Sequence, residues 1–248
     1  MKHELSRRNF FRTAGAAGAA TLPVAARGQT AEAPAHQVPA PGAAPSSALP
    51  EEMSFFFTEP EAAFVRAAAD RLIPPGEEWP GAAWAGVVTY IDRQLAGAYG
   101  NGARLYLEGP WEDGLPQQGY QLRYTPAQLY RVAIEEIRRD VEGRFGGQEF
   151  WELEPDAQDG VLKALEEGRV ELPSLPSAVF FETLLANTIE GFFADPLYGG
   201  NRDMVSWRMI GFPGAYAQYV DLVEEHGQPF DRPPMSMAES VSRHHRHG

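Results

Sequence analysis

Residues 177–194 have the sequence SAVFFETLLANTIEGFFA, and they predict the helix on which the fold depends. Their apolar side chains spread around most of the helix circumference, at Val179, Phe180, Phe181, Leu184, Leu185, Ile189, Phe192 and Phe193. A helix that is apolar on more than one side is buried on more than one side. We therefore expect this helix to be the central element of the domain.

The rest of the chain between residues 58 and 225 also has helical periodicity. Local start signals are a capping box at Thr58-Glu59-Pro60-Glu61, Thr125 followed by Pro126 at the first helical position, and Pro155. The flanking helices are expected over residues 58–72, 84–95, 125–143, 155–168 and 215–225. No run of alternating apolar and polar residues bounded by hairpin turns is present. The sequence therefore predicts a single compact all-α domain.

The N-terminus has the pattern of a twin-arginine export signal. Arg7 and Arg8 are followed by Phe10 and by an apolar run of mostly Ala and Gly that is too short to cross a bilayer. We assign residues 1–33 to this signal, because small-residue cleavage sites lie within that range. The twin-arginine route carries proteins that have already folded, so we expect a periplasmic chain that brings a cofactor or a bound partner.

Composition divides the remaining chain into three parts. Residues 34–50 contain five prolines among many alanines and are expected to form an extended tether. The helical domain is expected over residues 51–228, and residues 229–248 are expected to form a polar tail.

Charge and composition exclude several classes of function. The formal net charge of −13 repels nucleic-acid phosphates and anionic lipid headgroups. The absence of cysteine excludes thiolate nucleophiles, iron–sulfur clusters, covalently attached haem and Cys-based zinc sites. No histidine lies between His36 and His226, so neither a Ser-His-Asp triad nor a His-ligated metal is expected inside the fold. We expect no catalytic residue, cofactor or metal in this chain.

The acidic residues leave one catalytic alternative open. Glu190 with Asp195, or Glu135 and Glu136 with Asp140, could act as the acid and base of a stand-alone periplasmic glycoside hydrolase. In a chain with 34 acidic residues, such pairs also arise by chance. A solitary all-α binding module is a further alternative.

The densest local pattern follows the central helix. Asp195-Pro196 stops that helix, and Gly199-Gly200-Asn201 forms a turn that is able to take positive φ. A short helix capped by Asn201 or Asp203 follows. So tight a turn beside many aromatic residues is either a surface presented to a partner or an internal packing corner. The candidate partner-interface residues are Gly191, Phe192, Asp195, Pro196, Tyr198, Gly199, Gly200, Asn201, Arg202 and Trp207.

Two stretches, GFFADPLYGGNRD at residues 191–203 and WRMIGFPG at residues 207–214, resemble the small, third subunit of the gluconate 2-dehydrogenase family. The resemblance extends back over residues 55–95, where Arg71-Leu72-Ile73-Pro74 and Ile91-Asp92-Arg93-Gln94-Leu95 also match. It covers most of the chain after the signal, apart from residues 98–124 and the tail.

The resemblance implies a non-catalytic role in a larger assembly. In this family a large flavoprotein of the glucose-methanol-choline (GMC) type holds FAD and performs the catalysis, and electrons pass to a multihaem cytochrome c subunit that holds haem c. The small subunit looks like an escort that supplies the signal for the twin-arginine translocase and stabilises the flavoprotein. The complex is periplasmic and can be membrane-associated. Related complexes oxidise gluconate, glucose, fructose or other polyols, so the substrate stays open.

Overall fold

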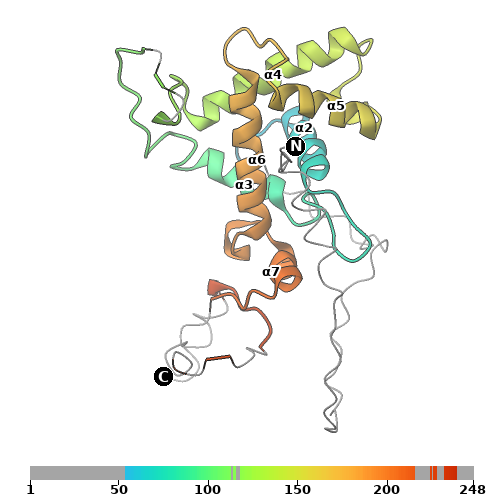
Figure 1. Cartoon of the computed structure of the whole chain (residues 1–248), viewed down its shortest axis with the longest axis vertical. Helices are drawn as coiled ribbons and strands as arrows, with labels where there is room; N and C mark the ends of the chain where they lie inside the picture. The colour runs from blue at the N-terminus through green and yellow to red at the C-terminus, as the bar shows by residue number, and fades with distance from the viewer. Residues whose placement is uncertain are drawn as a thin grey trace, which may run out of the picture. The chain divides into compact units, whose positions relative to one another are not determined.

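The computed structural model describes residues 54–112, 114–115, 118–215, 224, 226–227 and 232–238 (Figure 1). The signal with Arg7, Arg8 and Phe10, the tether, and nearly all of the helix expected over residues 215–225 lie outside the described residues. The elements are α2 (Glu59–Leu72), α3 (Val87–Ala96), α4 (Pro126–Arg144), η2 (Phe150–Glu152), α5 (Pro155–Glu166), α6 (Ser177–Phe193), η3 (Pro196–Tyr198), η4 (Arg202–Met204) and α7 (Val205–Ile210). The described part of the chain contains helices and no strand, which confirms the all-α prediction.

The central position predicted for residues 177–194 is confirmed, since α6 contacts α2, α3, α4, α5 and α7. Figure 1 shows α4 and α5 near the start of α6 and α7 beyond its end. Phe180, Leu184 and Phe192 on α6 are at most 2% exposed. Burial is not complete around the helix, however, because Glu182 and Glu190 are exposed along one side.

Aromatic side chains join four elements in the middle of the core. The ring centroid of Phe64 on α2 lies 5.0 Å from that of Phe150 on η2 and 6.3 Å from that of Phe180 on α6. Tyr130 on α4 packs edge-on against Phe180 at 5.4 Å. All four side chains are fully buried. Because removing a buried aromatic ring costs about 3–5 kcal/mol, this cluster fixes the mutual positions of these elements.

Local signals placed most helix starts correctly. α2 begins after Thr58, whose backbone N–H donates to the Glu61 carboxylate at 2.7 Å, as the capping box predicts. α4 begins after Thr125, whose hydroxyl accepts the Gln128 N–H at 3.3 Å. α5 begins at Pro155.

The start of α3 differs from the prediction. The apolar stripe from Trp84 indicated a helix over residues 84–95, but α3 begins at Val87. Gly86 has a φ of +84°, a left-handed conformation that a right-handed helix does not include. Trp84 therefore lies in the turn before α3, where its ring is 5.7 Å from the guanidinium carbon of Arg202.

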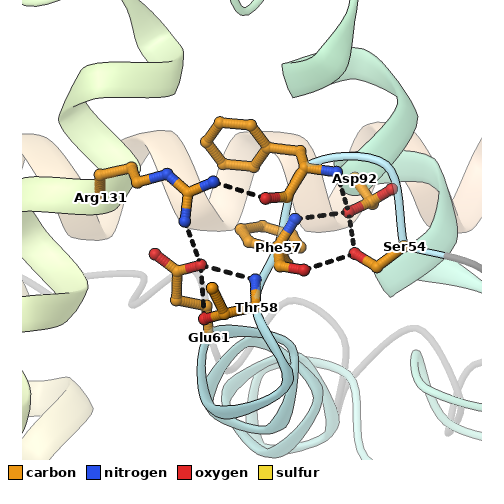
Figure 2. Close-up of polar contacts among 7 residues, drawn as sticks. Ser54, Phe57, Thr58, Glu61, Asp92 and Arg131 are labelled. Carbon is orange, nitrogen blue, oxygen red and sulfur yellow. Dashed lines mark hydrogen bonds and ion pairs between the residues drawn. The ribbon is translucent and has the colours of Figure 1, made fainter.

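One buried carboxylate fastens the segment that precedes α2 to α3 (Figure 2). Asp92 is 5% exposed and accepts a hydrogen bond from Ser54 Oγ at 2.6 Å. It also accepts the backbone N–H groups of Phe55, Phe56 and Phe57 at 2.7, 3.0 and 2.8 Å. Hydrogen bonds to a charged acceptor are roughly twice as strong as neutral ones. We call Asp92 and residues 54–57 the entry latch.

α4 holds the entry latch from a second side. Arg131 donates to the carbonyl oxygen of Phe56 at 2.6 Å and to the Glu61 carboxylate at 2.5 Å (Figure 2). Its guanidinium carbon lies 4.3 Å from the centre of the Phe56 ring. The start of the described domain is therefore fixed against α2, α3 and α4.

Residues 232–238 fall within the expected polar tail, but they pack against the domain. Met235 is 6% exposed and forms an isolated parallel bridge with Gly214. The Met235 N–H donates to the carbonyl of Pro213 at 3.1 Å, and its carbonyl accepts the Ala215 N–H at 2.7 Å. This part of the tail belongs to the folded domain because its backbone pairs with residues 213–215.

Candidate partner-binding surface

Asp195 stabilises the turn that follows α6. One carboxylate oxygen accepts the Leu197 N–H at 2.9 Å, which caps the short helix η3. The other oxygen accepts the Met237 N–H at 2.8 Å. Asp195 therefore joins the end of α6 to residues 232–238.

Two adjacent glycines in the turn are required for different reasons. Gly199 has a φ of +98°, as the sequence predicts for this turn. Gly200 does not have a positive φ, so the prediction is wrong at this position. A Cβ atom on Gly200 would lie 2.0 Å from the carbonyl oxygen of Gly191 on α6. Gly200 is needed because the two backbones touch, and its conformational freedom is not used.

Asn201 is the buried polar centre of the corner, with no exposed surface. Its Nδ2 donates to the carbonyl of Ala194 at 2.9 Å, at the end of α6. Its Oδ1 accepts both the N–H of Ser206 at 3.0 Å and the Ser206 hydroxyl at 2.7 Å. Met204 occupies the N-cap position of α7, where the sequence predicted Asn201 or Asp203. Asn201 instead accepts the N–H of Ser206 in the first turn of α7 from a position further back in the chain.

The backbone after the turn is held in a costly conformation. Asn201, Asp203 and Met204 have φ values of +46°, +55° and +54°. Left-handed conformations cost roughly 1–2 kcal/mol for most non-glycine residues, and they persist where surrounding contacts fix them. The bonds of Asn201 provide part of that fixation, and the Arg202 N–H, which donates to the carbonyl of Ala85 at 2.9 Å, provides another part.

Trp207 joins α7 to the end of α6. It is 6% exposed, and its Nε1–H donates to the carbonyl of Phe193 at 2.9 Å. Its ring packs edge-on against Phe212 at 5.1 Å. A Cβ atom on Gly214 would lie 2.8 Å from the Trp207 ring and 2.2 Å from the Met235 carbonyl. The corner is therefore close-packed from α6 to residue 235.

The structure brings the ten candidate interface residues together at this corner but buries most of them. Gly191, Phe192, Gly200, Asn201 and Trp207 are buried, and Asp195, Pro196, Gly199 and Arg202 are partly buried. Of the ten, Tyr198 is the exposed side chain, at 47%. The other nine hold the corner in shape.

Four further exposed apolar side chains lie on the segments that form this corner, namely η3, α7 with the residues after it, and residues 232–238. They are Leu197, Ile210, Phe212 and Met237, which are 54%, 58%, 45% and 37% exposed. We call these four residues and Tyr198 the corner patch. The bond between Asp195 and Met237 and the contact between Trp207 and Phe212 hold its parts together. Grouped exposed apolar side chains are typical of protein-interaction sites.

One half-exposed carboxyl group lies on α6 directly before the corner. Burial raises the pKa of Glu190 above its ordinary value. Burial, and then the Glu190 charge, raise the pKa of Tyr90, and the same two causes raise the pKa of Tyr99 to about 12. Tyr198 also raises the pKa of Tyr90. A Cβ atom on Gly191 would lie 2.8 Å from the Tyr90 ring, so Tyr90 packs against α6 directly beside Glu190.

Four of the five carboxylates considered for sugar hydrolysis have structural partners. Glu135 and Asp140 form ion pairs with arginines one turn further along α4. Glu136 accepts the Ser174 N–H at 3.2 Å, and both oxygens of Asp195 accept backbone N–H groups. Within the described ranges, no three His, Asp or Glu side chains gather as a metal site would require.

The sequence model for gluconate 2-dehydrogenase subunit 3 matches residues 59–214, from the start of α2 to the residue that pairs with Met235. The chain belongs to the gluconate 2-dehydrogenase subunit 3 family. A signal sequence of the twin-arginine translocation pathway matches residues 4–23, which include Arg7, Arg8 and Phe10. No curated protein and no solved structure matches the chain significantly.

Membership of the gluconate 2-dehydrogenase subunit 3 family confirms the resemblance carried by residues 191–203 and 207–214. The chain is thus a small exported subunit, and its twin-arginine signal directs it to the periplasm. None of the helices that the structure describes is long and apolar enough to span a membrane.

Proposed function

We propose that this subunit is the non-catalytic escort of a flavoprotein dehydrogenase. It binds a folded FAD-containing subunit of the glucose-methanol-choline type, accompanies it through the twin-arginine translocase and stabilises it in the periplasm. The assembled complex oxidises a sugar or sugar acid and passes electrons to a multihaem cytochrome c subunit.

The observation that carries this proposal is a twin-arginine signal on a member of this subunit family. The twin-arginine route serves proteins that fold before export. This chain has no cysteine and no recognisable cofactor motif, so it has little reason of its own to use that route. The signal therefore serves a partner that must load its cofactor in the cytoplasm.

The corner patch supports the proposal as the place where the partner binds. Its exposed side chains stand on a backbone fixed by Asn201, by the Gly191–Gly200 contact and by Trp207. A surface fixed before binding loses little conformational entropy when the complex forms. The patch also includes aromatic, Met and Leu side chains, which suit the centre of an interface.

The glycoside hydrolase alternative is less well supported. In the pair of Glu190 with Asp195, each carboxylate oxygen of Asp195 accepts one backbone N–H, from Leu197 or from Met237. A nucleophile or base needs a lone pair directed at the substrate or at water. The turn backbone orients the Asp195 carboxylate through these two hydrogen bonds, which is a structural role.

Export of the partner tests the proposal. The double variant Arg7→Lys/Arg8→Lys keeps the charge but loses the planar guanidinium groups, so we expect it to leave both this chain and the flavoprotein in the cytoplasm. Cell fractionation with detection of both subunits measures the result. Arg27→Lys, a change of the same kind outside the arginine pair, is the matched control and should leave export intact.

The two subunits must respond together. If the flavoprotein reaches the periplasm at its normal level while this chain is retained, the escort role is wrong. Retention of both subunits by the double variant, with normal export in the Arg27→Lys control, is the result that the proposal requires.

A further inference from the structure

A groove of about 900 Å³ runs along the exposed side of α6. Its floor is a stripe of α6 residues at helical spacing, which consists of Val179, Glu182, Thr183, Ala186, Asn187 and Glu190. Its opposite wall comes from Tyr99 and from residues 119–122. The Tyr99 hydroxyl donates to Asn187 Oδ1 at 3.1 Å and joins the wall to the floor. We call this feature the α6 groove.

The α6 groove is acidic. Three carboxylates, of Glu112, Glu182 and Glu190, line it, and no Lys, Arg or His is found among the lining residues that the structure describes. Carboxylates set in a concave surface concentrate the local negative potential. A basic occupant is therefore favoured, and an acidic one is repelled.

The remaining lining suits a polypeptide better than a free ion. Leu115, Leu122 and Val179 supply apolar surface. Thr183 Oγ1 donates to the Val179 carbonyl at 2.8 Å and Gln121 Nε2 donates to the Leu115 carbonyl at 3.0 Å, so these side chains offer a peptide their acceptor oxygens. Grooves that bind extended peptide segments combine apolar surface with hydrogen-bonding groups in this way. The groove is also large enough for several side chains of such a segment.

A second copy of this chain does not fit the groove. A two-fold symmetric contact would place the same acidic stripe of each copy against the other. The chain has a net charge of −13, so a different region of a second copy would also be acidic on average. Like charges facing each other across an interface are unfavourable, so the occupant is a different protein.

The end of the groove floor and the turn that carries Tyr198 are adjacent. Glu190 ends the groove floor, and the next residue, Gly191, contacts Gly200 in the corner. Gly191 packs against Tyr90, and Gly199, the neighbour of Tyr198, packs against Thr89, so α3 lies against both the end of the groove floor and the turn that carries Tyr198. A partner seated on Tyr198 is therefore in reach of the groove.

We propose that the α6 groove binds a basic, partly apolar polypeptide segment of the same partner that contacts the corner patch. This inference rests on the proposed function, because the partner is the escorted dehydrogenase subunit. The groove adds electrostatic selection to the apolar contact, so that an acidic or neutral protein does not occupy the surface.

Removal of two charges from the groove floor tests the inference in the complex. Glu182→Gln/Glu190→Gln keeps side-chain size, and we expect it to weaken binding of the purified flavoprotein subunit by about tenfold at low salt. The difference should shrink between about 50 mM and about 300 mM NaCl, because salt screens the lost attraction. The matched control, Glu77→Gln/Glu78→Gln, removes two exposed charges away from the groove and should bind as the natural chain does.

A defined probe tests the groove without the flavoprotein. A heptapeptide of alternating Lys and Leu should shift the backbone NMR signals of α6 residues 179–190, and a heptapeptide of alternating Glu and Leu should not. The Glu182→Gln/Glu190→Gln variant should lose most of the first response. Thermal unfolding of the same variant verifies that it is folded.

The two experiments separate this inference from the proposed function. If the flavoprotein binds the groove variant and the natural chain equally, the groove assignment is wrong and the escort role stands. If no flavoprotein binds either protein, the escort role fails, and a Lys/Leu peptide that leaves α6 unperturbed then overturns the groove as well.

Discussion

Gly200 allows the turn to approach α6 closely, because glycine has no Cβ atom. Because a Cβ atom there would lie 2.0 Å from a backbone oxygen of α6, no side-chain rotation can relieve the overlap. We expect Gly200→Ala to lower the free energy of unfolding by about 2–4 kcal/mol, as chemical denaturation measures. Gly160→Ala is the control, since nothing lies within 4 Å of its Cβ position in α5. It should raise stability by about 0.5–1 kcal/mol. Equal effects of the two changes would contradict the contact.

Glu190 is predicted to cost stability at neutral pH. Burial raises its pKa in the folded protein, so the folded state binds the proton more tightly than the unfolded chain does. The stability gained from this tighter proton binding is fully present below the ordinary glutamate pKa, and it is lost as the pH rises through the pKa of the folded state. Glu190→Gln should therefore raise the melting temperature at pH 7, and this gain should disappear below about pH 4. A lower melting temperature of the variant at pH 7 would contradict this assignment.

At the scale of elements, the entry latch depends on one carboxylate. Asp92→Asn replaces one acceptor oxygen with an NH₂ group that faces backbone donors, so we expect a loss of about 2–4 kcal/mol in the free energy of unfolding. Faster hydrogen exchange at Phe55, Phe56 and Phe57 should accompany it. Asp140→Asn breaks a surface ion pair and should cost at most about 1 kcal/mol. Unchanged exchange at residues 55–57 would show that Asp92 does not hold them.

Elements whose ends have local signals could be predicted from the sequence. Thr58, Thr125 and Pro155 placed three helix starts, because capping and proline effects act within one turn. The central place of α6 followed from its apolar circumference. The start of α3 was not predicted, because Gly86 packs against Gly199, which is distant in sequence. A Cβ atom on Gly86 would lie 2.6 Å from the Gly199 carbonyl oxygen, and a sequence window around residue 86 does not contain that contact.

The candidate site could be predicted only in part, because it too depends on contacts between residues that are distant in sequence. The motif located the corner, yet nine of its ten selected residues are wholly or partly buried, since a distinctive sequence reports tight packing as readily as recognition. Ile210 and Phe212 could have been selected from the sequence, because both lie in the WRMIGFPG stretch. Met237 was not, because it reaches the corner through a bond to Asp195, 42 residues earlier.

At the scale of the whole molecule, apolar contact should dominate binding of the partner at the corner. Tyr198→Ala and Ile210→Ser remove exposed side chains, so we expect both to leave the melting temperature nearly unchanged and to weaken co-purification of the flavoprotein. Tyr106→Ala is the matched control, because it removes an 81% exposed ring that is distant in sequence from the corner patch. Intact binding by a folded Tyr198→Ala/Ile210→Ser double variant would remove the corner patch from the interface.

The most direct test of the escort role is the absorption spectrum of the proteins that co-purify with this chain. The natural chain, affinity-tagged after residue 248 and purified gently from the periplasm, should bring with it a flavin-containing protein that oxidises a sugar or sugar acid. After the complex is dissociated and this chain is isolated, the chain should be colourless and inactive. A homogeneous chain that retains flavin absorption or oxidises sugars alone, or a periplasmic preparation that never contains a flavoprotein, would contradict the account.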